Sequence, residues 1–200
     1  MNNKISKTAI VAGVIVILIV AIAGAGISAY NGMVSGEENV RQAWSQVENQ
    51  YQRRSDLIPN LVNTVKGYAK HEQQTLTQVI EARSKATSTT VNFDQLDSET
   101  FAQYQAAQGQ LTQALGRLMV VAERYPELKA NENFRDLQSQ LEGTENRIST
   151  ERRRYNEAVQ SYNISIRKFP RNIFAGMFGF EQKEYFKAQE GTETAPVVEF

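Results

Sequence analysis

An uninterrupted apolar stretch from Thr8 to Tyr30 constrains this chain more than any other feature. Its 23 residues include no charged side chain, no amide side chain and no proline. A helix rises about 1.5 Å per residue, so about 20 apolar residues cross a hydrocarbon core of about 30 Å. We therefore predict a transmembrane helix over residues 8–30, preceded by a short cytoplasmic N-terminus of residues 1–7.

The charges on either side of the stretch predict its orientation. Lys4 and Lys7 precede it, whereas the first charges after it are Glu37 and Glu38. By the positive-inside rule, the N-terminus stays in the cytoplasm and the C-terminal part lies outside the cytoplasmic (inner) membrane. Small residues near the end of the stretch also permit cleavage as a signal peptide. A signal sequence has an apolar region of only about 7–15 residues, which favours a retained anchor.

The amino-acid composition argues against several classes of function for this chain. The 200 residues include 22 basic and 22 acidic side chains, one histidine and no cysteine. Zero net charge argues against a nucleic-acid-binding protein, and the lack of cysteine excludes lipoprotein anchoring, disulfides and thiolate sites. His71 lacks the second histidine of a zinc-protease motif, so we predict no catalytic residue, no metal site and no cofactor.

The remaining chain predicts an all-α fold, an antiparallel bundle of three to four long helices over residues 31–186. Apolar residues recur at helical spacing to about Ala86, with a kink or a break at Pro59, and a second helix covers residues 98–125. The third predicted helix carries apolar residues every seventh position, which is typical of coiled-coil-like packing. These are Phe134, Leu141, Ile148, Tyr155, Tyr162 and Phe169. Tyr155-Asn156 and Tyr162-Asn163 repeat one heptad apart. We predict that each tyrosine ring is buried on the apolar stripe with a hydrogen-bonding edge, and that its asparagine flanks the stripe.

The segment after Pro170 is rich in aromatic residues and interrupted by glycine. It either covers an open end of the bundle or contacts the membrane interface or a partner protein. The candidate contact residues are Phe174, Met177, Phe178 and Phe180. Residues 187–200 are predicted to be a disordered tail.

Six charged residues lie on or near the predicted buried seams: Arg54, Asp56, Glu72, Arg83, Glu145 and Glu151. A buried charge is costly unless it is paired, so we predict that these side chains pair between helices. Fixing the helix register is the simpler role for such pairs, and a ligand site is the alternative.

Tyr30-Asn31 after the apolar stretch is followed by distinctive sequence blocks, in order through most of the chain. They are AWSQVENQYQRRSDLIPNLV (43–62), VKGYAKHE (65–72), EAR (81–83), YPELKAN (125–131), LQSQLEGTENRI (137–148), RRYNEAVQSYN (153–163) and FPRNIFAGMFGF (169–180). With these blocks the sequence resembles the LemA family of bacterial membrane-anchored helical proteins. The resemblance implies one N-terminal membrane helix followed by an antiparallel, four-helix-bundle-like domain, and it implies no reaction.

These observations predict a single-pass, non-enzymatic scaffold or adaptor of the bacterial cell envelope. Its expected partners are membrane lipid along residues 8–30 and a protein of the envelope. We expect no nucleic-acid partner, and the sequence also permits self-association. The alternatives are an accessory or regulatory subunit of an envelope protease or quality-control enzyme, and a membrane-shaping protein that self-assembles. A hydrolase that uses carboxylates is a further alternative, which a bundle without an acidic pocket would exclude.

Overall fold

The computed structural model describes residues 7–187 except residues 70, 90, 92 and 94–96, and in these residues it contains helices and no strands. The helices are α1 (Lys7–Tyr68), α2 (Gln73–Ser88), α3 (Ser98–Ala122), α4 (Pro126–Ala130), α5 (Glu132–Arg167) and α6 (Arg171–Phe178). The prediction of an all-α fold is confirmed. Residues 1–6 of the predicted cytoplasmic N-terminus, and residues 188–200 of the predicted tail, lie outside the described residues.

The chain divides into two compact units. Unit 1 comprises Met1–Val40 and Ala158–Lys183, and unit 2 comprises Arg41–Glu157 and Glu184–Phe200. The long helices α1 and α5 each contribute residues to both units.

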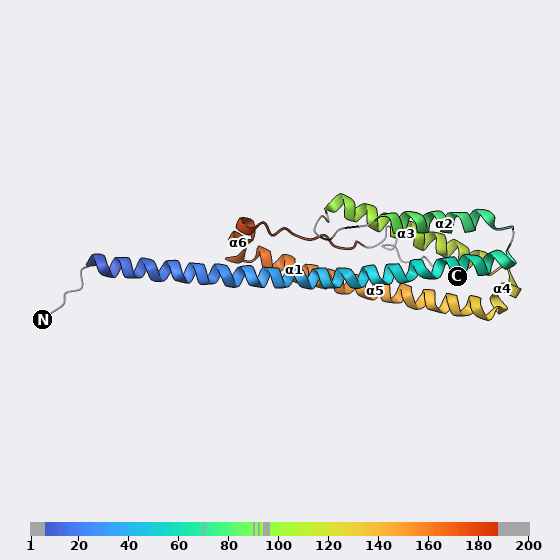
Figure 1. Cartoon of the computed structure of the whole chain (residues 1–200), viewed down its shortest axis with the longest axis horizontal. Helices are drawn as coiled ribbons and strands as arrows, with labels where there is room; N and C mark the ends of the chain where they lie inside the picture. The colour runs from blue at the N-terminus through green and yellow to red at the C-terminus, as the bar shows by residue number, and fades with distance from the viewer. Residues whose placement is uncertain (1–6, 70, 90, 92, 94–96, 188–200) are drawn as a thin grey trace, which may run out of the picture. The chain divides into compact units, whose positions relative to one another are not determined.

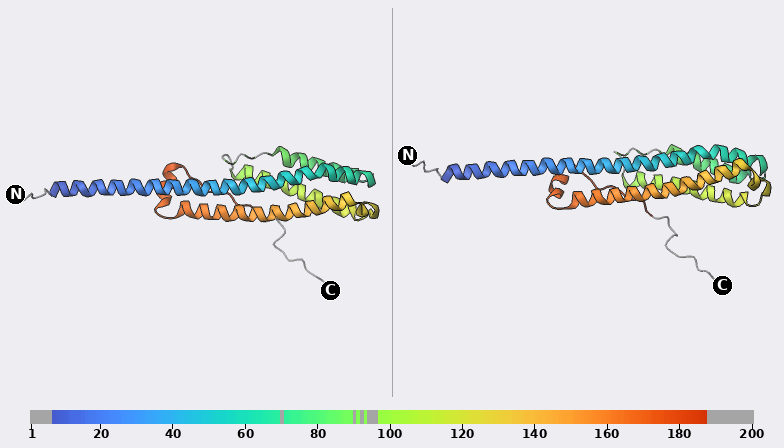
Figure 2. Two further views of the ribbon diagram at one scale, coloured as in Figure 1. Left: turned by 60° about the horizontal axis from the view of Figure 1, so that its bottom comes forward. Right: turned by 90° about the horizontal axis from the view of Figure 1, so that it is seen from below.

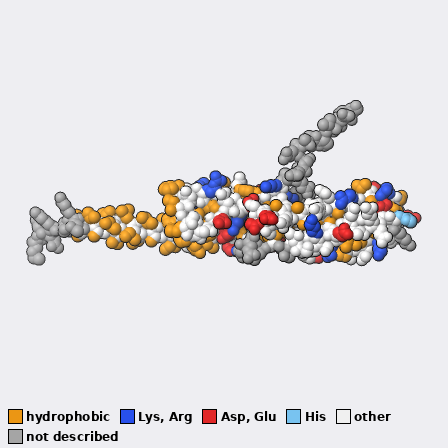
Figure 3. Space-filling view, turned by 90° about the horizontal axis from the view of Figure 1, so that it is seen from above, with side chains coloured by type: hydrophobic (Ala, Val, Ile, Leu, Met, Phe, Trp, Pro, Cys, Tyr) orange, Lys and Arg blue, Asp and Glu red, His pale blue; other side chains and the backbone are white. Residues whose placement is uncertain are grey.

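Unit 1 contains the apolar part of α1. From Ile10 to Ile27, the large apolar side chains are 51–69% exposed. Figure 3 shows hydrophobic side chains covering this part of α1 on the face in view. Within the described part of the chain, α1 is the one helix whose length and apolar composition suffice to cross a membrane; its most apolar 18 residues have a mean hydropathy of 3.0.

Unit 1 also contains α6 and the last turns of α5. In both views of Figure 2, α6 lies beside the early part of α1. At Gly26 the Phe174 ring lies 3.1 Å from the position that a Cβ atom would occupy. The helix α6 ends at Gly179, whose φ of 76° is left-handed and favours glycine.

Unit 2 is an antiparallel bundle formed by segments of α1, α2, α3 and α5, with the short α4 before α5 (Figure 1). Its core consists of aliphatic residues from all of these helices, among them Val65, Val79, Leu118, Leu128 and Leu141. The bundle therefore has four long helical segments.

The division between α1 and α2 differs from the prediction. A single helix to Ala86 was expected, bent or broken at Pro59, but α1 runs through Pro59 and ends at Tyr68. A turn then leads to Gln73, where α2 begins. The apolar stripe gives no sign of this turn, because Val65, Ala69, Leu76 and Val79 keep helical spacing across it and all are buried.

The helix tolerates Pro59 because a side chain replaces the backbone bond that proline removes. Proline has no N–H, so the carbonyl of the residue four positions earlier, Ser55, loses its helical partner. Arg83 of α2 donates a hydrogen bond from Nε to this carbonyl at 2.9 Å. The arginine thus completes α1 at the position where the proline interrupts it.

This arrangement predicts energetic coupling between Arg83 and Pro59. Arg83→Ala should lower the free energy of unfolding by about 1–3 kcal/mol, because it leaves a partly buried carbonyl without a partner. In a Pro59→Ala background the same change should cost clearly less, since the backbone N–H that alanine restores then bonds the Ser55 carbonyl. Denaturant unfolding of the four proteins measures the coupling, with exposed Arg53→Ala as the control. Equal costs in both backgrounds would contradict this role for Arg83.

Candidate functional site

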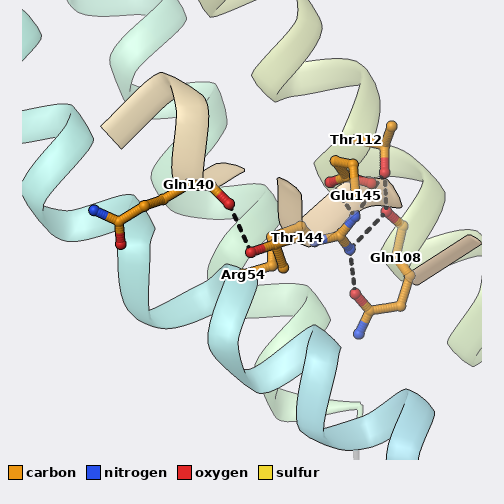
Figure 4. Close-up of polar contacts among 6 residues, drawn as sticks. All are labelled: Arg54, Gln108, Thr112, Gln140, Thr144 and Glu145. Carbon is orange, nitrogen blue, oxygen red and sulfur yellow. Dashed lines mark hydrogen bonds and ion pairs between the residues drawn. The ribbon is translucent and has the colours of Figure 1, made fainter. Parts of the chain in front are cut away.

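The most strongly buried charge in unit 2 is Arg54 of α1, which is 1% exposed and largest among the buried polar side chains. Its Nη1 donates to Glu145 Oε1 at 2.9 Å and to Thr112 Oγ1 at 2.8 Å. Its Nη2 donates to Gln108 Oε1, and its guanidinium carbon lies 5.0 Å from the centre of the Tyr51 ring. Figure 4 shows Arg54 of α1 with its hydrogen-bonding partners, Gln108 and Thr112 of α3 and Glu145 of α5.

This cluster joins three helices through one guanidinium group. Glu145 is 35% exposed on its side chain, so the ion pair reaches from the bundle interior to solvent. Gln108 and Thr112 of α3 complete the cluster and were not among the predicted residues. Gln108 carried a signal, because it lies seven residues after Phe101 and four after Tyr104 on the apolar stripe of α3, and it is buried there.

Two further predicted residues make contacts between elements. Glu72, in the turn before α2, accepts from Arg124 Nη2 and from the Tyr125 hydroxyl, each at 3.1 Å. Arg83 contacts α1 through the Ser55 carbonyl rather than through a carboxylate.

Asp56 and Glu151 differ from the expectation of pairing between helices. Asp56 is exposed and accepts from Gln52 Nε2 at 2.8 Å, one turn earlier on α1. Glu151 pairs with Arg154 of its own helix at 2.7 Å. Residues three or four apart face each other on a helix surface, so the nearest opposite group is local for both carboxylates.

The asparagines of the Tyr-Asn repeat hold the extended chain after α6. In unit 2, Asn156 donates to the Phe186 carbonyl at 3.0 Å and accepts from its N–H at 2.9 Å. In unit 1, Asn163 makes the same two bonds to Lys183, both 2.9 Å. The two asparagines are seven residues apart on a helix, and the residues that they bond, Lys183 and Phe186, are three residues apart in extended chain. Seven helical residues and three extended residues each span about 10 Å, so the two spacings match.

Phe186 completes an aromatic cluster in unit 2. It is 5% exposed, and its ring centre lies 4.9 Å from that of Phe101, 5.1 Å from that of Tyr155 and 5.9 Å from that of Trp44. Arg152 lies over its other face, with the guanidinium carbon 4.8 Å from the ring centre. The ring of Phe186, two residues from the start of the undescribed C-terminal part, is therefore part of the core of unit 2.

The predicted contact residues of the aromatic segment lie against α1 in unit 1. The ring centres of Phe178 and Phe180 lie 5.1 and 5.7 Å from that of Tyr30, both edge to face. Phe174 covers Gly26. Met177 is 65% exposed, and Phe169 and Ile173 beside it are 81% and 58% exposed. Much of the apolar surface of this segment is thus uncovered.

Metal-binding side chains do not gather in the described part of the chain. No three His, Cys, Asp or Glu residues lie close enough there to hold a metal ion. The single histidine, His71, is exposed in the turn between α1 and α2. The buried Arg54 and Gln108 side chains of unit 2 bond between elements instead.

Comparison with known proteins identifies the family. A sequence model of the LemA family matches residues 43–200, more than three quarters of the chain. The chain belongs to the LemA family. This membership confirms the resemblance noted from the sequence blocks.

The relatives of this LemA-family chain include magnetosome proteins and a protein named LemA. Magnetosome protein MamQ 1 and Magnetosome protein MamQ 2 of Paramagnetospirillum magneticum are each 29% identical to it over 92% of the chain and 73% of their own length. Protein LemA of Metamycoplasma hominis is 24% identical over 80% of the chain and 69% of its own length.

Buried tyrosines give this LemA-family bundle a predicted sensitivity to alkaline pH. Burial raises the pKa of Tyr51, Tyr104 and Tyr155 because the charged phenolate would lose its hydration. A raised pKa in the fold means that stability is complete below about pH 10 and falls as pH rises above it, by up to about 1.4 kcal/mol per pH unit for each such tyrosine.

Tyr104→Phe should therefore reduce the loss of unfolding free energy above about pH 10. Tyr185→Phe is the matched control, because Tyr185 is 39% exposed. Denaturant unfolding at neutral and alkaline pH measures both. The same alkaline slope in all three proteins would contradict the prediction.

Proposed function

We propose that this protein is a single-pass, non-enzymatic scaffold or adaptor of the bacterial cell envelope. In this proposal, residues 8–30 cross the inner membrane, the N-terminus is cytoplasmic and the helical bundle lies outside. The observation that carries it is α1 itself, in which an apolar segment with uncovered side chains continues without a break into a helix of the bundle.

The uncovered apolar segment supports the membrane anchor. In water, a contiguous apolar surface of this extent is unfavourable, whereas side chains of this kind are stable in hydrocarbon. All backbone groups of a helix are bonded within it, which a membrane span requires. Lys4 and Lys7 support the cytoplasmic position of the N-terminus.

The use of polar groups in unit 2 supports a scaffold rather than an enzyme. Arg54 bonds Glu145, Gln108 and Thr112, so its charge serves helix contacts. The names of the relatives, magnetosome protein and LemA, state no reaction.

Single cysteines test the topology, because the chain has none of its own. Ser149→Cys, at an exposed position of α5, should react with a membrane-impermeant maleimide in intact spheroplasts. Asn3→Cys should react only after the membrane is opened. If only Asn3→Cys reacts in intact spheroplasts, the proposed orientation is reversed. If neither cysteine reacts after lysis, something other than the bilayer blocks the two sites.

The scaffold role predicts a defined protein neighbour on the bundle. Val120 of α3 is 70% exposed, so a photo-crosslinking residue at this position should give adducts of discrete mass in cells. Exposed Arg147 of α5 provides a polar comparison position. Co-expression of two differently tagged copies separates self-association from a second protein. The absence of discrete adducts from both positions would contradict the scaffold proposal.

A further inference from the structure

The surface of α6 and the α1 residues beside it form an apolar groove in unit 1. The groove lies between residues 22–30 of α1 and Phe174, Met177 and Phe178 of α6, and it encloses about 460 Å³. This volume is within the range of about 300–1,000 Å³ for small-molecule sites. Almost all of its lining is apolar, so the groove suits a hydrocarbon group.

The contacts of α1 change character along this part of the helix. At Gly26 and Tyr30 its neighbours are the rings of Phe174, Phe178 and Phe180. Two residues beyond Tyr30, the neighbour of Gly32 is the Arg171 guanidinium group, which donates to Ser165 Oγ at 2.7 Å. Further along, Glu37 pairs with Lys183 at 2.7 Å. Apolar contacts therefore give way to charged contacts within about 10 Å of helix.

This change coincides with the end of the span at Tyr30. Gly26 lies four residues before Tyr30, which places Phe174 about 6 Å on the hydrocarbon side of that position. An interfacial helix buries its apolar face about 5–10 Å into the boundary between headgroups and acyl chains. The position of α6 along α1 matches that depth.

The charges near α6 match the chemistry of phospholipid headgroups. Residues 164–180 include three basic residues, Arg167, Lys168 and Arg171, and no acidic residue. Arg167 and Lys168 are exposed, as are the apolar side chains of Phe169, Ile173 and Met177. Basic residues beside exposed aromatic and aliphatic residues are typical of helices that lie in the interface of an anionic bilayer.

We infer that α6 lies in the outer interface of the membrane and that its groove holds an acyl chain of a bilayer phospholipid, with Arg167, Lys168 and Arg171 at the level of the headgroups. The inference rests on the proposed membrane span and adds a second lipid contact made by the C-terminal part of the chain. It gives the exposed side chains of Phe169, Ile173 and Met177 a hydrocarbon environment.

An environment-sensitive fluorophore on single cysteines tests the inference in the full chain. We would label Met177→Cys and Ile173→Cys in nanodiscs of phosphatidylcholine with phosphatidylglycerol, and add lipids that carry a nitroxide near either end of the acyl chain. Both positions are more than half exposed, so labelling should leave Trp44 emission native. Both should show blue-shifted emission, quenched most by the nitroxide near the headgroup.

Two further positions separate this inference from the proposed anchor. Ile17→Cys, in the middle of the apolar segment, should be quenched most by the nitroxide near the methyl end, and Val120→Cys should not be quenched. Quenching at 17 without quenching at 173 or 177 would overturn the position of α6 and leave the anchor intact. No quenching at 17 would overturn the anchor.

A pair of glycine variants tests the groove itself. A Cβ atom at Gly26 would lie 3.1 Å from the Phe174 ring, so Gly26→Leu would collide with it, whereas a Cβ atom at Gly24 meets no atom within 4 Å among the described residues. Gly26→Leu should therefore weaken the quenching at 177, and Gly24→Leu should not, while the signal at 17 stays the same in both. Equal quenching at 177 in the two variants would overturn the groove as the lipid site.

Discussion

Phe186→Ala should lower the free energy of unfolding by about 3–5 kcal/mol, the usual cost of removing a buried aromatic ring. The ring packs against those of Phe101 and Tyr155 and is stacked on Trp44, with an interplanar angle of 13°. Its removal would leave a cavity in the aromatic cluster that contains the single tryptophan. Such a loss is a large fraction of the total stability of a typical domain, which is about 5–15 kcal/mol.

The neighbouring residue gives a matched control for this prediction. Tyr185 is 39% exposed, so Tyr185→Ala should change the free energy of unfolding by less than about 0.5 kcal/mol. Because Trp44 is 1% exposed and is the one tryptophan of the chain, its emission reports the cluster directly. Denaturant unfolding in detergent micelles, followed by Trp44 emission and by circular dichroism, measures both variants.

The result also decides how the extended segment is attached. If Phe186→Ala lowers the midpoint seen by both signals, the segment unfolds together with the helices of unit 2. If Trp44 emission changes while the midpoint stays the same, the segment docks independently of the bundle. The second outcome would contradict the prediction, and Asn156→Ala, which removes two bonds to the Phe186 backbone, should then have the same effect.

Much of the fold follows from local sequence patterns. The predicted heptad positions from Phe134 to Tyr162 are buried, because a repeated seven-residue spacing places side chains on one face of a long helix. The last predicted position, Phe169, is 81% exposed, because α5 ends at Arg167. The start of α3 was also predictable, since Asp97 is a favoured N-cap residue and its carboxylate accepts from the Thr100 N–H at 2.7 Å.

The turn after Tyr68 was not predictable from periodicity. A helix that folds back on itself keeps the same apolar spacing on both sides when each arm faces the same core. Pro59 was a stronger local signal for a break, but Arg83, which lies 24 residues later, replaces the lost bond. A contact this distant in sequence cannot be derived from helix propensity.

The candidate polar residues show the same limit. Spacing placed Arg54 correctly in the interior, and burial then required a partner. Spacing alone could not choose the partner, because Asp56 and Glu151 were predicted near the seams as well, yet Asp56 is exposed and both carboxylates find local partners, at 2.8 and 2.7 Å. The partners of Arg54 also include Gln108 and Thr112, neutral residues that a search for opposite charges passes over.

Arg54→Ala should lower the free energy of unfolding by about 3–5 kcal/mol, because it removes a large buried side chain that bonds to both α3 and α5. The change leaves Gln108 and Thr112 without a donor that they now share, and it opens space at a position that is 1% exposed. Glu145→Ala should cost less, about 1–3 kcal/mol, because its side chain is 35% exposed and water can reach the guanidinium group from that side.

The double variant separates the ion pair from the packing around it. Because Arg54 Nη1 and Glu145 Oε1 are 2.9 Å apart, the two changes together should cost less than the sum of the single changes, with a coupling of about 1–3 kcal/mol. Arg53→Ala and Glu142→Ala are the matched controls, since both residues are exposed on the same two helices and their effects should add. Additive costs for Arg54 and Glu145 would contradict an energetic link between α1 and α5 through this pair. Arg54→Met sharpens the test: if the arginine serves mainly to fix how the helices pair, methionine should recover much of the stability lost in Arg54→Ala while the coupling to Glu145 disappears.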